Sequence, residues 1–323
     1  MRLGSALVMA ISVLCPASVQ AQSAAYPAKA LRIVVPLAPG GNVDIVVRAL
    51  AQQLSDGSGW QVVVDNRPGA SSLVGTQLVA KTPADGYTIL AIANTFATVP
   101  SIMSNPGYDV FRDFSAVTLT CLVPMVLVVN PALPVRNVKE LIALGKSRPG
   151  ELSYATAGAG STGHIAGELL SRHVGMKMLH VPYKGNSQAI VDVIGGQVML
   201  MFDQISTAEP QVKAGKLRGL AVTSLKRSPL LPNLPTIDES GAPRFEEITF
   251  NGLVAPAGTP REIRARIQQE IAKAVATPKL RERFIERGVE LKASASPEEF
   301  AAYIKAEFDK KAKLAKEANI KID

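Results

Sequence analysis

The sequence contains few of the residues that build disulfide-stabilised, metal-binding or nucleic-acid-binding proteins. Only 2 of its 323 residues are cysteine and 3 are histidine, and none of them has the spacing of a zinc site. Aromatic residues make up 5% of the chain and do not alternate with basic residues. This argues against a base-stacking surface, even though the formal net charge is +8. We therefore predict no metal site and no nucleic-acid partner.

The sequence also lacks a hydrophobic run long enough to cross a membrane. Its N-terminal apolar stretch, residues 3–14, follows Arg2 and leads to Val19-Gln20-Ala21, which has the small residues that a signal peptidase recognises. We predict a signal peptide over residues 1–21 and an exported mature chain. Cys15 leaves with this peptide, so Cys121 is then alone and no intramolecular disulfide is expected.

What the sequence does contain is one repeated pattern. A short β-branched run ends in a loop of glycine, serine or asparagine, and a helical pattern follows. This pattern recurs at residues 31–54, 61–81, 88–95, 152–172, 179–187, 198–204 and 217–224. Strands that alternate with helices predict an α/β fold of the doubly wound class, with mainly parallel sheets and helices on both faces. Ligands of such sheets bind at the carboxyl ends of the strands.

Two extended segments interrupt this pattern. Residues 121–129 and 248–254 are apolar, have no glycine-rich loop and are not followed at once by a helix. We predict that they pair and cross between two lobes as hinge strands. The first lobe would contain residues 26–124 and 252–323, and the second would contain residues 125–251.

The C-terminal part of the chain is helical by pattern. A helix is expected after Thr259, with Pro260 at its first position and Glu262 completing a capping box. The last helix is expected to begin at Ser296-Pro297, where a cap residue, a proline and two acids follow in order.

Gly158, Gly160 and Gly163 have the spacing of a dinucleotide-binding fingerprint, which would imply a nicotinamide cofactor. That fingerprint requires an acidic residue at the end of the next strand to hold the ribose. Here the strand at 179–183 ends at Lys184, and the compartment of an exported protein is not expected to supply a diffusible cofactor. We predict no cofactor.

A nucleophilic serine at Ser161 is the next alternative. The G-x-S-x-G motif lacks its first glycine, and His164 lies only three residues further along the same helix. We predict no catalytic residue. An exported hydrolase that uses Ser161 and His164 is retained as the competing hypothesis.

The loops at Gly40, Ser71 and Gly160 each place small residues before a helix, which is a common way to bind an anion. Asp44 would repel an anionic ligand. We therefore expect it to accept N–H groups near the start of its helix and to pair with Arg48.

Asp203 follows the strand pattern at 198–202 and has two possible roles. It could cap the helix that comes next. It could instead hold an ammonium or hydroxyl group of the ligand. The sequence leaves both roles open.

These motifs together resemble the tripartite tricarboxylate transporter receptor family, the Bug-type periplasmic solute-binding proteins. The resemblance runs through Pro36-Leu37-Ala38-Pro39-Gly40-Gly41-x-x-Asp44-x-x-x-Arg48, Asn66-Arg67-Pro68-Gly69-Ala70, Pro83-Ala84-Asp85-Gly86-Tyr87-Thr88, Gly160-Ser161-x-x-His164, Val181-Pro182-Tyr183-Lys184-Gly185, Gly195-Gly196-Gln197-Val198 and Ala255-Pro256-Ala257-Gly258-Thr259-Pro260. It implies a two-lobed flytrap of the type II periplasmic binding protein class. It also implies a periplasmic location, a monomer, a small carboxylate bound between the lobes, and delivery to a two-subunit membrane permease. A sensor that passes the ligand signal to another protein is a further alternative.

By position, the resemblance assigns the ligand to loops on both lobes. The ligand-binding residues it implies are Pro39, Gly40, Gly41, Asn42, Asp44, Ala70, Ser71, Ser72, Asn94, Thr95, Gly160, Ser161, Thr162, His164, Tyr183, Lys184, Gly185 and Asp203. Ser71-Ser72 is a departure, because the family usually has a glycine there. Either the backbone approaches the ligand less closely at this loop, or a hydroxyl group replaces a water.

Overall fold

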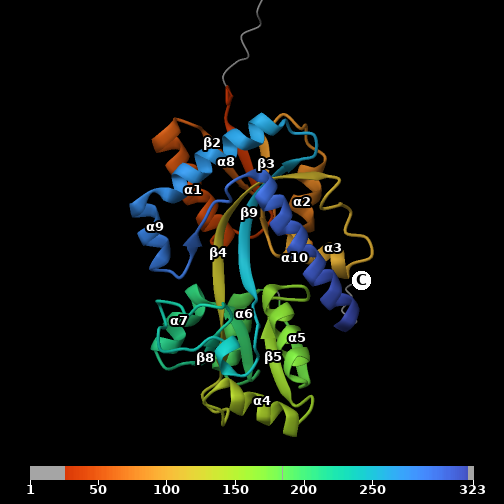
Figure 1. Ribbon diagram of the computed structural model, residues 1–323, viewed down its shortest axis with the longest axis vertical. Helices are drawn as coiled ribbons and strands as arrows, with labels where there is room; N and C mark the ends of the chain where they lie inside the picture. Colours follow the sequence, from red (N-terminus) through yellow and green to blue (C-terminus); the bar gives the residue numbers. More distant parts are fainter. Residues whose placement is uncertain (1–25, 184, 319–323) are drawn as a thin grey trace, which may run out of the picture.

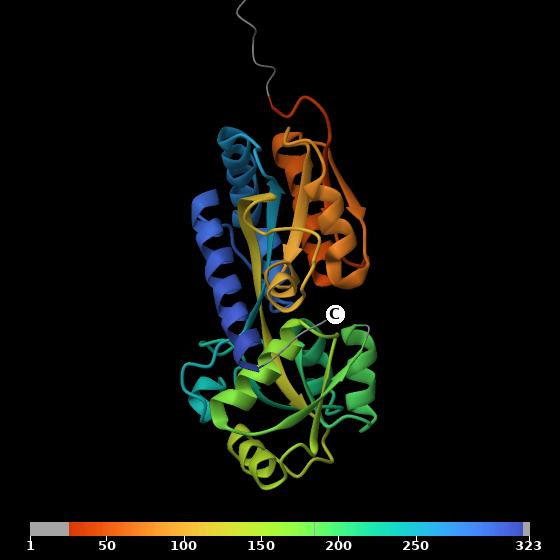
Figure 2. The same ribbon diagram turned by 90° about the vertical axis from the view of Figure 1, so that its right-hand side faces the viewer.

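Two α/β lobes are joined by two long strands that run from the upper lobe into the lower one (Figure 1). The computed structural model describes residues 26–183 and 185–318, so the predicted signal peptide and Lys184 lie outside the described residues. In the turned view, the long C-terminal helix runs down one side of the upper lobe to the lower lobe (Figure 2). Within the described ranges, no helix has the length and apolar character needed to cross a membrane.

The upper sheet begins with three parallel strands in the order β2-β1-β3. Their bounds are β1 (Leu31–Val35), β2 (Val62–Asn66) and β3 (Thr88–Ala93). Next to β3 lies β9 (Ile248–Pro256), which is antiparallel to it, and then β4 (Phe114–Val129), antiparallel to β9. The short β10 (Glu290–Leu291) pairs with β4. The upper sheet is therefore parallel at one side and antiparallel where the connecting strands enter.

In the lower sheet, three parallel strands lie in the order β6-β5-β7. Their bounds are β5 (Leu152–Thr156), β6 (Met178–Pro182) and β7 (Leu200–Gln204). The second half of β4 lies antiparallel to β7 and also pairs antiparallel with β8 (Arg218–Val222).

The strand β4 thus belongs to both sheets, and it changes partners at a proline. Pro124 pairs with Ile248 in the ladder with β9, and Met125 opens the ladder with β7. A proline has no N–H group to donate, so it is tolerated where one ladder ends and another begins. Residues 121–124 do pair with 248–251 in this structure. The division of the chain into lobes at 124/125 and 251/252 stays a prediction.

Helices cover both faces of each sheet, as the alternating pattern predicts. In the upper lobe, one face carries α1 (Asn42–Ser58), α8 (Arg261–Ala276) and α9 (Pro278–Ile285), and the other carries α2 (Leu73–Ala80), α3 (Thr95–Ile102) and α10 (Pro297–Ala318). In the lower lobe, α6 (Asn186–Ile194) and α7 (Ile205–Lys213) lie opposite α4 (Val138–Ser147) and α5 (Thr162–Val174). Two short 3₁₀ turns are at Ala70–Ser72 and Asp238–Ser240.

One predicted helix cap is confirmed and the other is wrong. The Ser296 hydroxyl accepts the Glu299 N–H at 3.2 Å, and the Glu299 carboxylate accepts the Ala295 N–H at 2.8 Å. At α8, in contrast, the Thr259 hydroxyl donates to the Pro256 carbonyl at 2.8 Å and does not cap the helix. Thr259 is held by the turn before it, so the helix begins one residue later than predicted.

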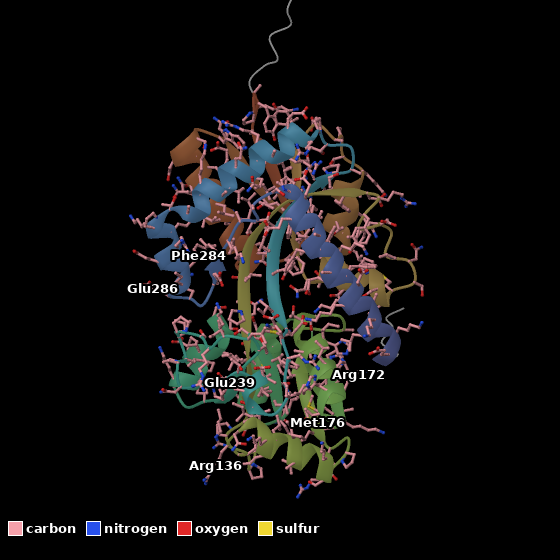
Figure 3. All side chains as sticks on the ribbon, viewed as in Figure 1. Arg136, Arg172, Met176, Glu239, Phe284 and Glu286 are labelled. Atoms are coloured by element: carbon pink, nitrogen blue, oxygen red, sulfur yellow. The ribbon has the colours of Figure 1, made fainter. Side chains whose placement is uncertain are left out.

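The helix α10 links the two lobes. Phe300 and Ile304 pack in the upper core, and farther along the helix Lys311 is buried beside Glu247, next to the start of β9. Near its end, Glu317 lies 3.8 Å from Arg172 of α5 in the lower lobe. Figure 3 shows Arg172 beside the end of this helix.

Candidate functional site

A cavity of about 190 Å³ lies between the lobes; we call it the interlobe cavity. The upper lobe contributes Leu37, Asn42, Val43, Ala93, Asn94 and Thr95; the strands β4 and β9 contribute Met125, Thr249 and Asn251; and the lower lobe contributes Ala157, Ser161, Thr162, Gly163, Asn186, Phe202 and Gln204. The cavity is smaller than the roughly 300–1,000 Å³ of drug-sized ligand sites, which suits a small solute.

Helix N-termini converge on this cavity from both lobes. The first residues of α1, α3, α5 and α6 all line it, and these are Asn42, Thr95, Thr162 and Asn186. Gln204, directly before α7, lines it as well. The first turn of a helix leaves N–H groups without intrahelical partners and carries a partial positive charge. The cavity is therefore surrounded by groups that attract an anion.

The walls of the cavity carry no formal charge among the residues that the structure describes. They consist of carboxamide, hydroxyl and apolar side chains. Any anion that binds here would consequently be stabilised by backbone dipoles and neutral hydrogen-bond donors from these residues.

The structure brings together five of the residues predicted from the sequence to bind ligand. These are Asn42, Asn94, Thr95, Ser161 and Thr162, which come from both lobes. The other described residues of that prediction do not line the interlobe cavity: Pro39, Gly40, Gly41, Asp44, Ala70, Ser71, Ser72, Gly160, His164, Tyr183, Gly185 and Asp203. Their assignment as ligand contacts stays a prediction, and Lys184 lies outside the described residues.

Asp44, in the first turn of α1, stabilises the loop that precedes this helix. Its carboxylate accepts the Gly40 N–H at 2.9 Å and the Asn66 amide at 2.9 Å, and it pairs with Arg48 at 3.0 Å. Burial alone would raise the pKa of Asp44, but these hydrogen bonds and the Arg48 charge lower it below its usual value. The predicted pairing of Asp44 with Arg48 is confirmed.

Asp203 is completely buried and holds a residue that does line the cavity. It accepts the Asn186 amide at 2.8 Å and the Thr207 hydroxyl. Burial raises the pKa of Asp203 to about 6, although the hydrogen bonds act in the opposite direction. Gln204 occupies the cap position of α7, so the alternative of Asp203 as its N-cap is wrong.

His164 fixes the loop at residues 158–161. Its Nδ1 accepts the Gly160 N–H at 3.0 Å, and its ring stacks on His180 with the centroids 4.0 Å apart. Burial lowers the pKa of both histidines to about 4, so they are neutral near pH 7. The Ser161 hydroxyl accepts the backbone N–H of His164 at 3.4 Å and thereby caps α5. This contact uses the backbone of His164 and does not use its imidazole.

Two further predicted loops do not line the cavity, and one of them contacts a residue that does. Ala70, Ser71 and Ser72 have φ angles of 45°, 53° and 75°, which non-glycine residues rarely adopt. This conformation places the Ser72 hydroxyl 3.0 Å from that of Thr95, which lines the cavity. In the lower lobe, the Tyr183 hydroxyl donates to Asp192 at 2.7 Å, and this bond raises the tyrosine pKa to about 12.

Sequence reasoning did not select Thr249, Asn251, Asn186 or Gln204. A signal for the first two was present. Thr249 and Asn251 are polar residues two positions apart in an otherwise apolar strand segment, which places both side chains on one face of β9. Asn186 and Gln204 belong to loops that were predicted, but nothing in the sequence shows that they line the cavity.

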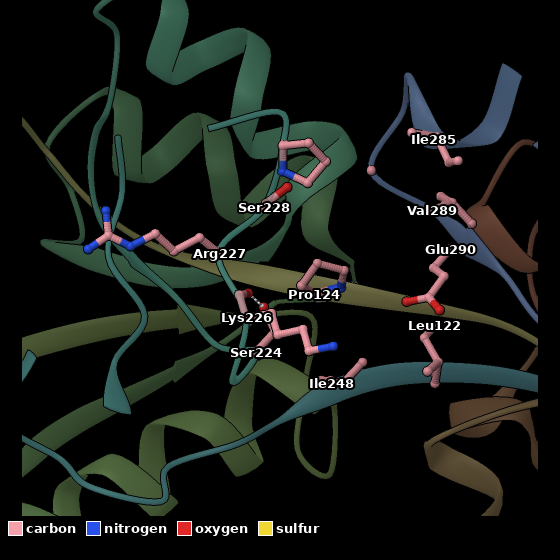
Figure 4. A pocket seen from close by; sticks show the side chains of 12 residues that line it. Leu122, Pro124, Ser224, Lys226, Arg227, Ser228, Ile248, Ile285, Val289 and Glu290 are labelled. Carbon is pink, nitrogen blue, oxygen red and sulfur yellow. Dashed lines mark hydrogen bonds between the residues drawn. The ribbon is translucent and has the colours of Figure 1, made fainter. Parts of the chain in front are cut away.

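A second cavity, of about 310 Å³, lies on the opposite face of the connecting strands (Figure 4). Leu122, Pro124 and Ile248 line it, whereas their neighbours Met125 and Thr249 line the interlobe cavity. Successive residues of a strand point to opposite faces. The strands β4 and β9 therefore form a partition with one cavity on each side.

The chain is similar to known proteins in both sequence and structure. Residues 46–320 match the model of the tripartite tricarboxylate transporter family receptor. The chain belongs to this family. It is 35% identical to Protein BugT of Bordetella pertussis over 92% of this chain and 91% of that protein. Among solved structures it is similar to R. palustris Rpa4515 with adipate (TM-score 0.83, 36% identity, 92% of this chain and 99% of that one). It is also similar to the periplasmic binding protein BugD (TM-score 0.80, 39% identity, 92% and 99%).

The family membership and these structures establish the predicted fold. The receptor is a two-lobed α/β flytrap of the periplasmic binding protein type, in which the strand β4 joins the sheets of the two lobes into one mixed, 10-stranded sheet.

Proposed function

We propose that this receptor binds a small organic carboxylate in the interlobe cavity and delivers it to a two-subunit membrane permease. The observation that carries the proposal is the convergence of four helix N-termini on a cavity whose described walls bear no charge. The related structure with bound adipate supports a carboxylate ligand. We further propose that the receptor is exported to the periplasm, acts as a monomer and performs no catalysis.

The expected strength of binding agrees with a receptor that closes on its ligand. A helix N-terminus stabilises an anion by about 0.3–1 kcal/mol, and by up to about 2 kcal/mol when partly buried. Hydrogen bonds to a charged group add about 1.5–3 kcal/mol each. Association itself costs about 4 kcal/mol or more, so the contacts from one lobe alone leave little net binding free energy. Binding between two lobes removes the carboxylate from water and strengthens every one of these contacts.

The test is thermal unfolding of the purified mature chain against a panel of di-, tri-, hydroxy- and aromatic carboxylates. A ligand present at 100 times its Kd is expected to add about 2.7 kcal/mol to the free energy of unfolding. The uncharged alcohols with the same carbon skeletons serve as controls and should have no effect. A panel in which no carboxylate raises the unfolding temperature would contradict the proposal.

A charge variant locates the binding site. Asn42→Asp places an acid at the first position of α1, where a negative charge favours the helix but repels an anionic ligand. We expect the fold to remain stable and the affinity for the carboxylate to fall at least about tenfold, or 1.4 kcal/mol. Gln269→Glu is the matched control, because Gln269 is exposed on α8 and does not line the cavity. Equal affinities for the two variants would place the ligand elsewhere.

A further inference from the structure

Two polar side chains in the wall of the interlobe cavity are buried without hydrogen-bond partners. Asn251 is 2% exposed and Thr249 is 4% exposed. Neither amide atom of Asn251, nor the Thr249 hydroxyl, has a partner among the described groups. Almost all buried polar atoms in native proteins are hydrogen-bonded. Three buried polar atoms without partners on one face of β9 therefore require an explanation.

Asn94, another asparagine in the same wall, has a structural role. The Asn94 amide donates to the Ile248 carbonyl at 3.0 Å and accepts the Phe250 N–H at 2.8 Å, so it ties the start of α3 to β9. Asn186 is held through its amide nitrogen by Asp203. The Asn251 side chain makes no such hydrogen bond with the described residues.

The neighbours of Asn251 in the sheet offer its side chain no hydrogen-bond partner of ordinary geometry among the described residues. Its strand lies between β3 and β4, where it pairs with Ala93 and Cys121. The Cys121 thiol is close enough for the amide to influence its pKa, but no hydrogen bond of ordinary geometry joins them, and a thiol is a weak partner in any case. The free amide faces the cavity.

The chemistry of an amide restricts what it can bind. Its nitrogen donates hydrogen bonds and its oxygen accepts them. A carboxylate could use the nitrogen but would leave the oxygen facing a negative charge. A hydroxyl or a carboxamide donates as well as accepts, so it can satisfy Asn251 and the Thr249 hydroxyl together.

We propose that the ligand carries, besides its carboxylate, a neutral hydroxyl or carboxamide group that Asn251 and Thr249 recognise. This inference rests on the proposed carboxylate site and adds a second recognition point to it. The helix N-termini hold the charged end of the ligand, and β9 selects the neutral end.

The test compares ligands that differ only in the terminal group. Succinate, glutarate and adipate are each measured by calorimetry against their half-amides, in which one carboxylate is replaced by a carboxamide of the same shape. For the chain length that fits, we expect the half-amide to bind at least about tenfold more tightly than the diacid. The corresponding hydroxy acid should exceed the plain monocarboxylate in the same way.

Two variants connect this preference to the residues. Asn251→Leu has a similar size and removes both hydrogen-bonding atoms, and Thr249→Val removes only the hydroxyl. We expect the preference for the half-amide to disappear in Asn251→Leu and to weaken in Thr249→Val. Both variants should unfold at a higher temperature without ligand, because each removes buried polar groups that have no hydrogen-bond partner. A purely structural asparagine would instead destabilise the protein when replaced.

The outcomes separate this inference from the proposed function. Diacids that bind as tightly as their half-amides, or a preference unchanged in both variants, would overturn the inference and leave a carboxylate receptor. Failure of every carboxylate to bind would overturn both.

Discussion

The stacked imidazoles of His164 and His180 should make the stability of the protein depend on pH. Both rings are neutral in the folded protein, because burial lowers their pKa values to about 4. In the unfolded chain a histidine titrates near 6.5. Between these values the unfolded state binds protons that the folded state excludes, so the free energy of unfolding falls as the pH falls.

We expect the stability of the receptor to be complete above about pH 7 and to decline towards pH 4. A fall in the His164 pKa from 6.5 to about 4 corresponds to roughly 3 kcal/mol. Urea unfolding of wild type and His164→Asn at pH 7.0 and 4.5 measures this, since asparagine retains an acceptor for the Gly160 N–H. The decline should be smaller in the variant.

The control for this experiment is His173→Asn, at an exposed histidine of α5. It should reproduce the wild-type decline. Asp203 acts in the opposite sense, because its raised pKa of about 6 makes the folded state bind a proton over part of the same range. Equal pH dependence in wild type and His164→Asn would refute the assignment.

At the level of elements, the packing of α10 on β9 depends on one glycine. A Cβ atom at Gly252 would lie 2.1 Å from the Phe300 ring and 2.9 Å from the Thr118 carbonyl oxygen. Neither group can move away easily, because Phe300 is fully buried in the upper core and Thr118 belongs to the sheet.

Gly252→Ala is therefore expected to lower the free energy of unfolding by about 3 kcal/mol or more. Gly57→Ala is the matched control. Gly57 lies within α1 with no neighbouring atom near its absent Cβ, so alanine should stabilise the helix by about 0.5–1 kcal/mol. Urea denaturation of both variants checks the prediction, and similar stabilities would refute it.

The helices and strands could be predicted from the sequence more accurately than their end residues and the contacts of their side chains. The β-branched runs and glycine loops predicted most strands to within a few residues, because period and composition reflect burial directly. Ser296 and Thr259 show the same cap pattern, but the Ser296 hydroxyl accepts an N–H three residues ahead in its helix, whereas the Thr259 hydroxyl donates to the Pro256 carbonyl three residues behind. The role of Asp203 required knowing that α6 brings Asn186 beside it, which is a tertiary contact. Asn251 could be placed on a strand, but its lack of partners emerges only from the packed structure.

On the scale of the whole molecule, a buried ion pair fixes α10 to the junction between the lobes. Lys311 and Glu247 are 1% and 0% exposed and pair with each other, and Glu307 lies 3.4 Å from Lys311. Lys310 lies 3.2 Å from the second Glu247 oxygen, without hydrogen-bond geometry. Removing one partner of such a pair leaves a charge buried without full compensation.

Lys311→Met should accordingly cost about 3–5 kcal/mol of stability. Adding Glu247→Gln should recover part of that loss, because the uncompensated charge is then removed. Lys305→Met on the exposed side of the same helix should change stability by no more than about 1 kcal/mol. Thermal and urea unfolding of the four proteins measure these differences. A double variant less stable than Lys311→Met would show that charge compensation is not the cause.

Cys121 is fully buried in β4 and is the only cysteine of a chain expressed without residues 1–21. Burial raises the pKa of its thiol to about 12, and only the thiolate reacts with maleimides. The folded protein should therefore remain unlabelled at pH 7, whereas the unfolded chain should take up one label, as mass spectrometry would show. New cysteines at the exposed positions Lys279 and Lys146, one in each lobe, could then carry a pair of fluorophores without removal of the native thiol. Energy transfer between them would report any change in the distance between the lobes, in a receptor whose connecting strands β4 and β9 keep their native sequence.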